Sequence, residues 1–133
     1  MQTTTIFVII GIIATLMTTA VVSQVNAQGG LDEMINDLKN DGEALKAEIN
    51  STNLYKTNKV QDLIYKVAYF EGQISAMGGG TWAYLHDVQD TLLAKIKATG
   101  EDGFTTSELA SIDHFATQAA QSKIDHPSTN VFG

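Results

Sequence analysis

The sequence predicts an all-α protein: an up-and-down four-helix bundle that follows an N-terminal apolar signal or anchor helix. Three observations lead to this fold class. The first 31 residues carry no charged side chain, whereas the rest of the 133-residue chain holds all fifteen acids and all eight lysines. Four stretches of the charged part repeat apolar residues at steps of three and four, the period of an amphipathic helix. Short glycine-rich or polar connections separate them, and no strand-like alternation competes with them.

The leader contains one long apolar run, IFVIIGIIATLMTTAVV, at residues 6–22. This run is slightly short for a membrane-spanning helix, which needs about 20 residues, and slightly long for the apolar region of a signal peptide. Compact residues at 25–27 favour signal-peptidase cleavage after Ala27. No lysine or arginine precedes the run, so an uncleaved membrane anchor and an apolar helix buried in a soluble fold are the alternatives. The expected organisation is a leader at 1–27, a four-helix domain at 28–125 and a flexible tail at 126–133.

The first helix of the charged part is expected at about 31–50. Leu31, Leu38 and Leu45 recur there every seven residues, and charged side chains fill the other faces. This spacing is typical of helices that pack nearly parallel to one another. Gly42 interrupts the helix at a cost of about 1 kcal/mol relative to Ala, which suggests a close helix contact or a bend at this position.

The second helix is expected to begin near Asn53 or Asn58 and to end at Met77. The three glycines at 78–80 follow it. Glycine loses more backbone entropy on folding than any other residue, so the helix is unlikely to continue through three of them.

A third helix is expected at about 82–98, with Thr81 as its N-cap. The fourth is expected from Thr105 to about Lys123. It opens with a capping box, in which the Thr105 hydroxyl accepts from the amide of Glu108 and the Glu108 carboxylate accepts from the amide of Thr105. Its expected apolar face is narrow and includes three alanines; it comprises Leu109, Ile112, Phe115, Ala116, Ala119, Ala120 and Ile124.

Composition excludes several classes of function. Cysteine is absent, which excludes disulfide frameworks, thiolate metal sites and cysteine nucleophiles. Arginine is absent as well, and the net charge is −7, so we expect no nucleic-acid partner. The chain has no G-x-S-x-G elbow, H-E-x-x-H pair or phosphate-binding glycine loop. We therefore expect a protein that is not an enzyme and that needs no cofactor.

Three residues are candidates for a copper or zinc site. His86 and Asp90 stand four residues apart, on one face of the third helix, and His114 lies on the fourth. Imidazole and carboxylate groups are ordinary ligands of both metals. The alternative is that these histidines make ordinary hydrogen bonds at the surface or at the edge of the core.

Haem is a second cofactor alternative. Met34 near the start of the first helix, with His114 or His126 late in the chain, resembles the axial ligand pair of exported four-helix cytochromes. The likeness covers helix count, size and those ligand positions, and no CxxCH motif for covalent attachment is present. Met34 also belongs to the apolar row of its own helix, so a packing role is the alternative.

Asn50 begins the sequence Asn-Ser-Thr, which matches the N-glycosylation sequon. It falls at the expected connection between the first two helices, where an exported protein would expose it. The alternative is a solvated turn. The middle helices also carry aromatic residues, Tyr55 and Trp82 among them, which either belong to the core or line a slot for a ligand or partner.

The leader without basic residues, which ends in Val-Asn-Ala-Gln, and the acidic, arginine-free helical body resemble small exported proteins of ammonia-oxidising archaea. The visible likeness covers residues 1 to about 30. It implies a setting in the cell envelope and a role as an accessory subunit of a membrane-bound oxidase. No site residue follows from it.

Together these observations predict an exported, membrane-associated helical protein. It would act outside the cytoplasm as a binding or accessory subunit, with a protein partner at the outer face of the cytoplasmic membrane. A retained leader would add the membrane itself as a partner. The alternative function is an extracytoplasmic carrier of copper, zinc or haem.

Overall fold

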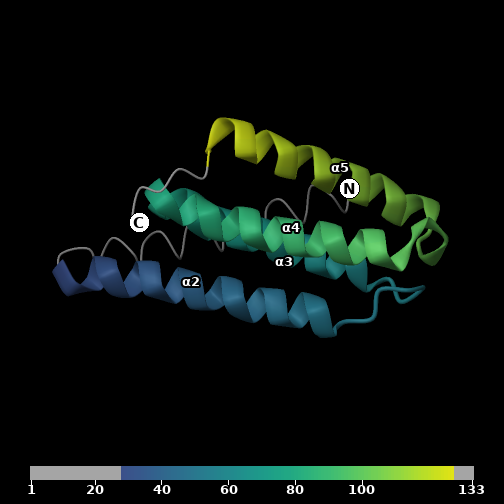
Figure 1. Cartoon of the computed structure of the whole chain (residues 1–133), viewed down its shortest axis with the longest axis horizontal. Helices are drawn as coiled ribbons and strands as arrows, with labels where there is room; N and C mark the ends of the chain where they lie inside the picture. Colours follow the sequence, from purple (N-terminus) through teal and green to yellow (C-terminus); the bar gives the residue numbers. More distant parts are fainter. Residues whose placement is uncertain (1–27, 128–133) are drawn as a thin grey trace, which may run out of the picture.

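The computed structural model describes residues 28–127, and this part of the chain is all-helical (Figure 1). Its four α-helices are α2 Gln28–Ser51, α3 Lys59–Met77, α4 Trp82–Thr99 and α5 Thr106–Asp125. Single 3-10 turns, η1 Gly79–Thr81 and η2 Glu101–Gly103, precede α4 and α5. Residues 28–127 contain no β-strand, so the all-α class predicted from the sequence is confirmed for them.

The expected leader and its cleavage point after Ala27 lie outside the described residues, as do residues 128–133 of the tail expected at 126–133. Both stay predictions. Within the described part, no helix combines the length and the apolar character needed to cross a membrane.

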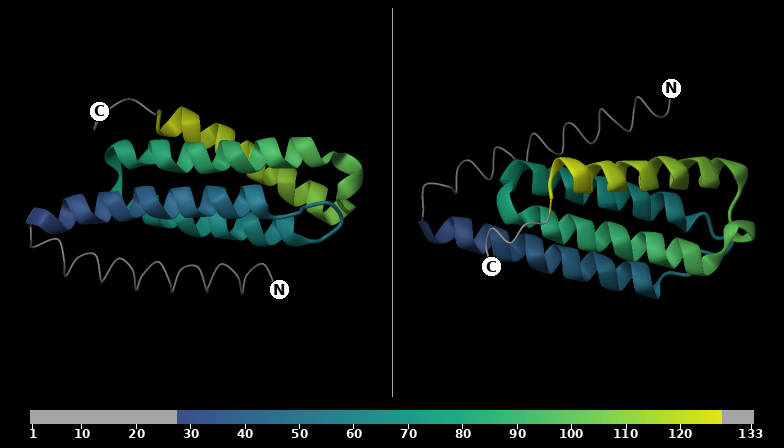
Figure 2. Two further views of the ribbon diagram at one scale, coloured as in Figure 1. Left: turned by 60° about the horizontal axis from the view of Figure 1, so that its bottom comes forward. Right: turned by 45° about the horizontal axis from the view of Figure 1, so that its top comes forward.

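Consecutive helices run in opposite directions (Figures 1 and 2). The α3 and α4 helices pack against each other, α2 packs on both from one side, and α5 packs on both from the other. The most extensive contact of α2 is with α4, which runs in the same direction, and not with α3, which follows α2 in the chain. The first turns of α2 project beyond the ends of α3 and α4 (Figure 2).

The core fills the space between the helices with aliphatic side chains, most of which come from the rows predicted by helical spacing. Burial of each such side chain contributes about 1.5–3 kcal/mol. In α2 the buried row begins at Leu38, because Leu31 stands on the projecting turns and is 46% exposed. The fully or nearly fully buried members are Ile49, Leu54, Val60, Leu63, Val67, Phe70, Ile74, Leu85, Val88, Leu92 and Phe115.

Glycines end two of the helices as the sequence predicts. Gly78, after the last residue of α3, has φ 71°, and Gly100, after α4, has φ 90°. Side-chain-bearing residues rarely adopt such angles, which explains glycine at both positions. Gly42 has a different role, because a Cβ atom there would lie 3.2 Å from Cζ of Phe70. The close helix contact predicted at Gly42 is thus confirmed.

The two predicted N-caps have opposite outcomes. Thr81 precedes α4, but it has helical backbone angles and its side chain makes no capping bond. Its buried hydroxyl instead donates to the carbonyl of Gly78 at 2.5 Å, so the predicted cap is wrong. Thr105 forms the complete capping box: its hydroxyl accepts from the Glu108 amide at 3.1 Å, and its amide donates to Oε1 of Glu108 at 2.7 Å.

The buried row of α5 differs from the predicted one at both ends. Glu108 and Ser122 are buried, whereas Ile124 is 71% exposed. The buried residues 108, 115, 119 and 122 are spaced by seven, four and three positions, so they lie on one face of the helix. Ile124 lies off that face, so its predicted place in the core is wrong.

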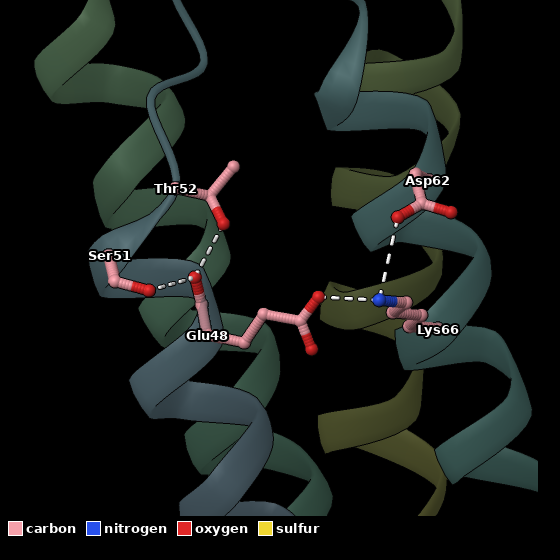
Figure 3. Close-up of polar contacts among 5 residues, drawn as sticks. All are labelled: Glu48, Ser51, Thr52, Asp62 and Lys66. Atoms are coloured by element: carbon pink, nitrogen blue, oxygen red, sulfur yellow. Dashed lines mark hydrogen bonds and ion pairs between the residues drawn. The ribbon is translucent and has the colours of Figure 1, made fainter.

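One ion pair crosses each of three helix contacts in the described part. Lys46 of α2 pairs with Asp87 of α4, and Lys123 of α5 with Asp90 of α4 at 2.6 Å. Glu48 of α2 pairs with Lys66 of α3 at 2.5 Å, and Lys66 also lies 3.6 Å from Asp62 (Figure 3). These partly exposed pairs are worth about 0–1 kcal/mol each. They fix which faces meet more than they stabilise the fold.

Candidate functional site

The two most unusual polar environments lie at opposite ends of the helices. We call the first the histidine cluster. It lies where the C-terminal end of α5 meets the beginning of α4 and the later turns of α3. Its members are Glu71, Trp82, His86, Ser122 and His126.

His86 is the buried centre of the histidine cluster. Its side chain is only 5% exposed, and its Nε2 atom lies 3.3 Å from the hydroxyl oxygen of Ser122 on α5. Burial lowers the pKa of His86, because desolvation disfavours the charged imidazolium, while a hydrogen bond with the backbone of Ser122 acts in the opposite direction. The neutral imidazole is therefore the form that the fold favours.

The rim of the histidine cluster is made of stacked rings and a carboxyl group. The imidazole of His126 lies flat on the indole of Trp82, with ring centroids 3.6 Å apart. Burial raises the pKa of Glu71 on α3, and the charge of His126 opposes that change. Glu71 of α3, His86 of α4 and His126, which follows α5, are thus near enough at this end for the charge of His126 to act on the other two.

The histidine cluster contains a serine hydroxyl beside an imidazole, which is the pair that activates a serine nucleophile. Such a pair acts only where a substrate can reach it. Ser122 and His86 are each 5% exposed, and they face each other across the α4–α5 contact. The arrangement therefore joins two helices and is not placed to attack a substrate.

The structure separates the three predicted copper or zinc ligands. His86 is buried against Ser122, Asp90 is paired with Lys123, and His114 is exposed on α5. His114 precedes Ser122 by two turns of α5, about 12 Å along the helix. Within residues 28–127, no three histidine, aspartate or glutamate side chains gather closely enough to hold a metal ion.

The predicted haem ligands lie on helices that do not face each other. Met34 is half-buried on α2. His114 lies on α5, and His126 is the residue that directly follows α5. The α3–α4 pair lies between these two helices. His126 is moreover occupied by its stacking contact with Trp82.

The second unusual environment is a hollow at the other end of the helices, which we call the Tyr55 hollow. It has a volume of about 430 Å³ and is formed by the end of α2, the connection to α3 and the last turns of α4. That volume is within the range of small-molecule sites. Its lining residues are Ser51, Thr52, Asn53, Leu54, Tyr55, Lys95, Ala98 and Thr99.

Hydrogen bonds hold the walls of the Tyr55 hollow in place. The Lys95 ammonium donates to the backbone carbonyl of Asn50 at 2.8 Å, and the Thr99 hydroxyl donates to the carbonyl of Lys95 at 2.9 Å. The Tyr55 ring packs on Gly103, where an added Cβ would lie 2.7 Å from Cδ2 of Tyr55. Tyr55 is still 44% exposed, so part of its aromatic surface remains accessible.

The sequence reasoning missed the Tyr55 hollow as a site and found only two of its neighbours, Asn50 and Tyr55. A usable signal was present. The run of small polar residues at 51–53 ends in Leu54, which is 1% exposed and anchors the connection. Lys95 and Thr99 stand four residues apart on one face of α4. What the sequence does not show is that α2 and α4 pack side by side, which brings both groups together.

Comparisons with protein-family models, with curated proteins and with solved structures each gave no match. The function of the protein therefore has to follow from the residues of its own chain.

Proposed function

We propose that this protein is an exported, non-enzymatic helical subunit that binds a protein partner at the outer face of the cytoplasmic membrane. In this proposal the four helices form an up-and-down bundle behind a signal peptide or an N-terminal anchor. The resemblance to small exported archaeal proteins suggests a membrane-bound oxidase as the partner complex.

The junction between the leader and α2 is the observation that carries the proposal. In the sequence the uncharged leader immediately precedes α2, and the first turns of α2 project beyond the neighbouring helices (Figure 2). On these turns Leu31 is 46% exposed, and Met34 and Ile35 are half-buried. The three residues stand at steps of three and one along a single helix face. An exposed apolar side chain that continues a buried row is suited to contact with another apolar surface.

The charges around this apolar face indicate which kind of partner surface would be complementary to it. Asp32, Glu33 and Asp37 are all exposed on the same turns of α2. No lysine or arginine precedes Lys39 in the chain. A partner surface with an apolar centre and a basic rim would be complementary in both respects.

The buried state of the histidine cluster supports a binding role over a catalytic one. Its serine and histidine are covered by helix packing, as described above, and the Tyr55 hollow is lined by hydroxyl-bearing residues, one asparagine, one lysine and the apolar residues Leu54 and Ala98. This set of groups can hold a polar ligand by hydrogen bonds. It offers no carboxylate or imidazole for general acid–base work.

Two measurements on the native protein test the location. Intact mass shows whether the chain begins at Gln28, and fractionation with protease accessibility shows on which side of the membrane the helices lie. We expect an extracytoplasmic protein. A full-length chain protected inside the cytoplasm would overturn the proposal. Stoichiometric copper or zinc, or a haem absorption band, would support the carrier function instead.

Partner binding is tested by co-purification from gently solubilised membranes. We expect Leu31→Ser and Asp32→Lys each to reduce recovery of the partner, since they alter the apolar face and its acidic border. Ile124→Ser is the matched control, because Ile124 is also a highly exposed aliphatic side chain but lies on α5. Equal losses in Leu31→Ser and Ile124→Ser would contradict binding through α2, and recovery of a free monomer would contradict a subunit role.

A further inference from the structure

The only N-glycosylation sequon of the chain lies beside the Tyr55 hollow. Residues 50–52 read Asn-Ser-Thr, and no other asparagine is followed by serine or threonine two positions later. Asn50 is exposed on the last turn of α2, while the next two residues line the hollow. The Lys95 ammonium, which also lines the hollow, donates to the backbone carbonyl of Asn50. The modification sequence and the hollow are therefore parts of one local structure.

We propose that Asn50 carries an N-linked glycan whose first sugar lies in the Tyr55 hollow. This inference rests on the proposed export of the protein, because glycan transfer to sequons occurs on chains that cross a membrane. It adds a modification site and an occupant for the hollow to that function.

The hydrogen bonds of the sequon determine when transfer takes place. In the folded helix the hydroxyls of Ser51 and Thr52 both donate to the backbone carbonyl of Glu48, at 3.1 and 2.7 Å (Figure 3). The Glu48 side chain in turn pairs with Lys66 of α3 (Figure 3). The Thr52 hydroxyl is thus engaged once α2 has formed and docked. Transfer therefore precedes folding of this turn, and the exposed position of Asn50 leaves room for the product afterwards.

The transfer reaction is balanced by one co-reactant, a polyprenyl-phosphate-linked sugar. Nδ2 of Asn50 forms a bond to the anomeric carbon of that sugar, and the bond from this carbon to the phosphate oxygen breaks. The amide nitrogen loses one proton, and the polyprenyl phosphate leaves. No oxidant or reductant takes part.

The lining of the Tyr55 hollow fits a sugar ring. The exposed part of the Tyr55 ring, which has the Lys56 ammonium 5.2 Å from its centroid, offers apolar contact to the C–H groups of a pyranose. Side chains of Asn53 and Thr99 and the ammonium of Lys95 offer hydrogen bonds to its hydroxyls. The hollow is also large enough, at about 430 Å³, and it is open to solvent.

Mass spectrometry of protein secreted by the native host, or by a host that performs N-glycosylation, tests the modification. We expect a mass excess that maps to the peptide containing Asn50 and that disappears after glycan release. Asn50→Gln should abolish it. Thr52→Ser should retain it because serine also completes the sequon, and Asn53→Gln should retain it because it leaves the sequon intact. An unmodified mass on protein shown to lie outside the membrane would overturn this inference and leave the proposed function standing. Unprocessed protein inside the cytoplasm would instead overturn the proposed function.

Thermal unfolding tests whether the sugar occupies the hollow. We expect the glycosylated protein to melt roughly 3 °C above the same protein after glycan release. Tyr55→Ala should be glycosylated normally but lose this difference. Tyr65→Ala is the control, because Tyr65 is a tyrosine of α3 outside the hollow and the difference should persist there. A difference that is absent in the wild type, or unchanged in Tyr55→Ala, would show a glycan directed into solvent and overturn the occupancy.

Discussion

The indole of Trp82 and the imidazole of His126 are stacked, with centroids 3.6 Å apart and planes inclined by 1°. Trp82 is the first residue of α4, and His126 directly follows α5. The contact therefore anchors the C-terminal end of α5 to the start of α4. Because Trp82 is the only tryptophan of the chain, its fluorescence reports on this one contact.

Replacing His126 by Ala should increase the tryptophan emission, because an imidazole in contact with an indole quenches it. The same change should speed amide exchange in the last turn of α5, which loses its anchor. His114→Ala is the control, since His114 is exposed on the same helix and its replacement should leave both readings unchanged. Unaltered emission in His126→Ala would show that the rings are not stacked in solution.

The contribution of His86 to stability should fall as the pH decreases below about 6.5, the ordinary pKa of histidine; the raised pKa of Glu71 contributes a slope of the opposite sign. The pKa of His86 is lowered by burial, so the unfolded chain binds the proton first and the slope is at most about 1.4 kcal/mol per pH unit. Above that pH His86 contributes no slope. The charges of Lys123 and His126 also lower the pKa of His86, whereas the charge of Asp90 raises it.

The pH effect is measured by urea unfolding at a series of pH values between 5 and 8. His86→Leu should remove the slope that His86 contributes, because an aliphatic side chain can be buried without a proton equilibrium. His114→Gln, at an exposed position, should keep it. If His86→Leu retained the wild-type slope, the buried imidazole would not be its source.

Thr105→Ala should lower the free energy of unfolding by about 1 kcal/mol, because it removes the side-chain acceptor of the capping box. Glu108→Ala should also destabilise the fold, and the double variant should cost less than the sum, because the two residues share one pair of bonds. Denaturant unfolding of the four proteins gives the coupling energy. Ser107→Ala, at an exposed neighbouring position, should change little. Strictly additive losses would contradict a reciprocal cap.

Gly42 and Gly72 should respond in opposite ways to larger side chains. Gly42→Leu should destabilise the protein by about 1–3 kcal/mol, because even a Cβ atom there meets Phe70 at 3.2 Å. Gly72→Ala should stabilise α3 by about 0.5–1 kcal/mol, since no atom lies within 4 Å of its added Cβ. Thermal unfolding of both variants is the measurement. A stable Gly42→Leu protein would mean that α2 and α3 are not closely packed at this point.

The order and limits of the described helices were largely predictable, because they depend on local chemistry. The glycines after Met77 and the box at Thr105 act within a few residues of the chain, and both act as predicted. Thr81 shows the limit of such reasoning. An N-cap threonine has extended backbone angles and accepts from an amide of the first turn, whereas Thr81 follows a glycine turn with helical angles and its hydroxyl donates to the carbonyl of Gly78.

Features that depend on helix pairing could not be predicted. An amphipathic helix shows which face it buries but not against which neighbour, so the α2–α4 contact and the Tyr55 hollow were not foreseen. The same holds for the histidines. Each has an aspartate beside it in the sequence, yet His86 is buried with a serine of another helix, and His126 is stacked on an indole.

An even number of alternating helices returns the chain to the end from which it started, so α2 begins and α5 ends at the same pole of the molecule (Figures 1 and 2). This matters for handling the protein. Immobilising a chain that begins at α2 through the start of that helix, or through the end of α5, would present the opposite pole to solution, with the Tyr55 hollow and Asn50 free. An affinity tag or a fluorescent fusion at either of these two helix ends would instead crowd the projecting turns of α2. A reporter for partner binding is therefore better inserted between Glu101 and Asp102, two exposed residues of the far turn.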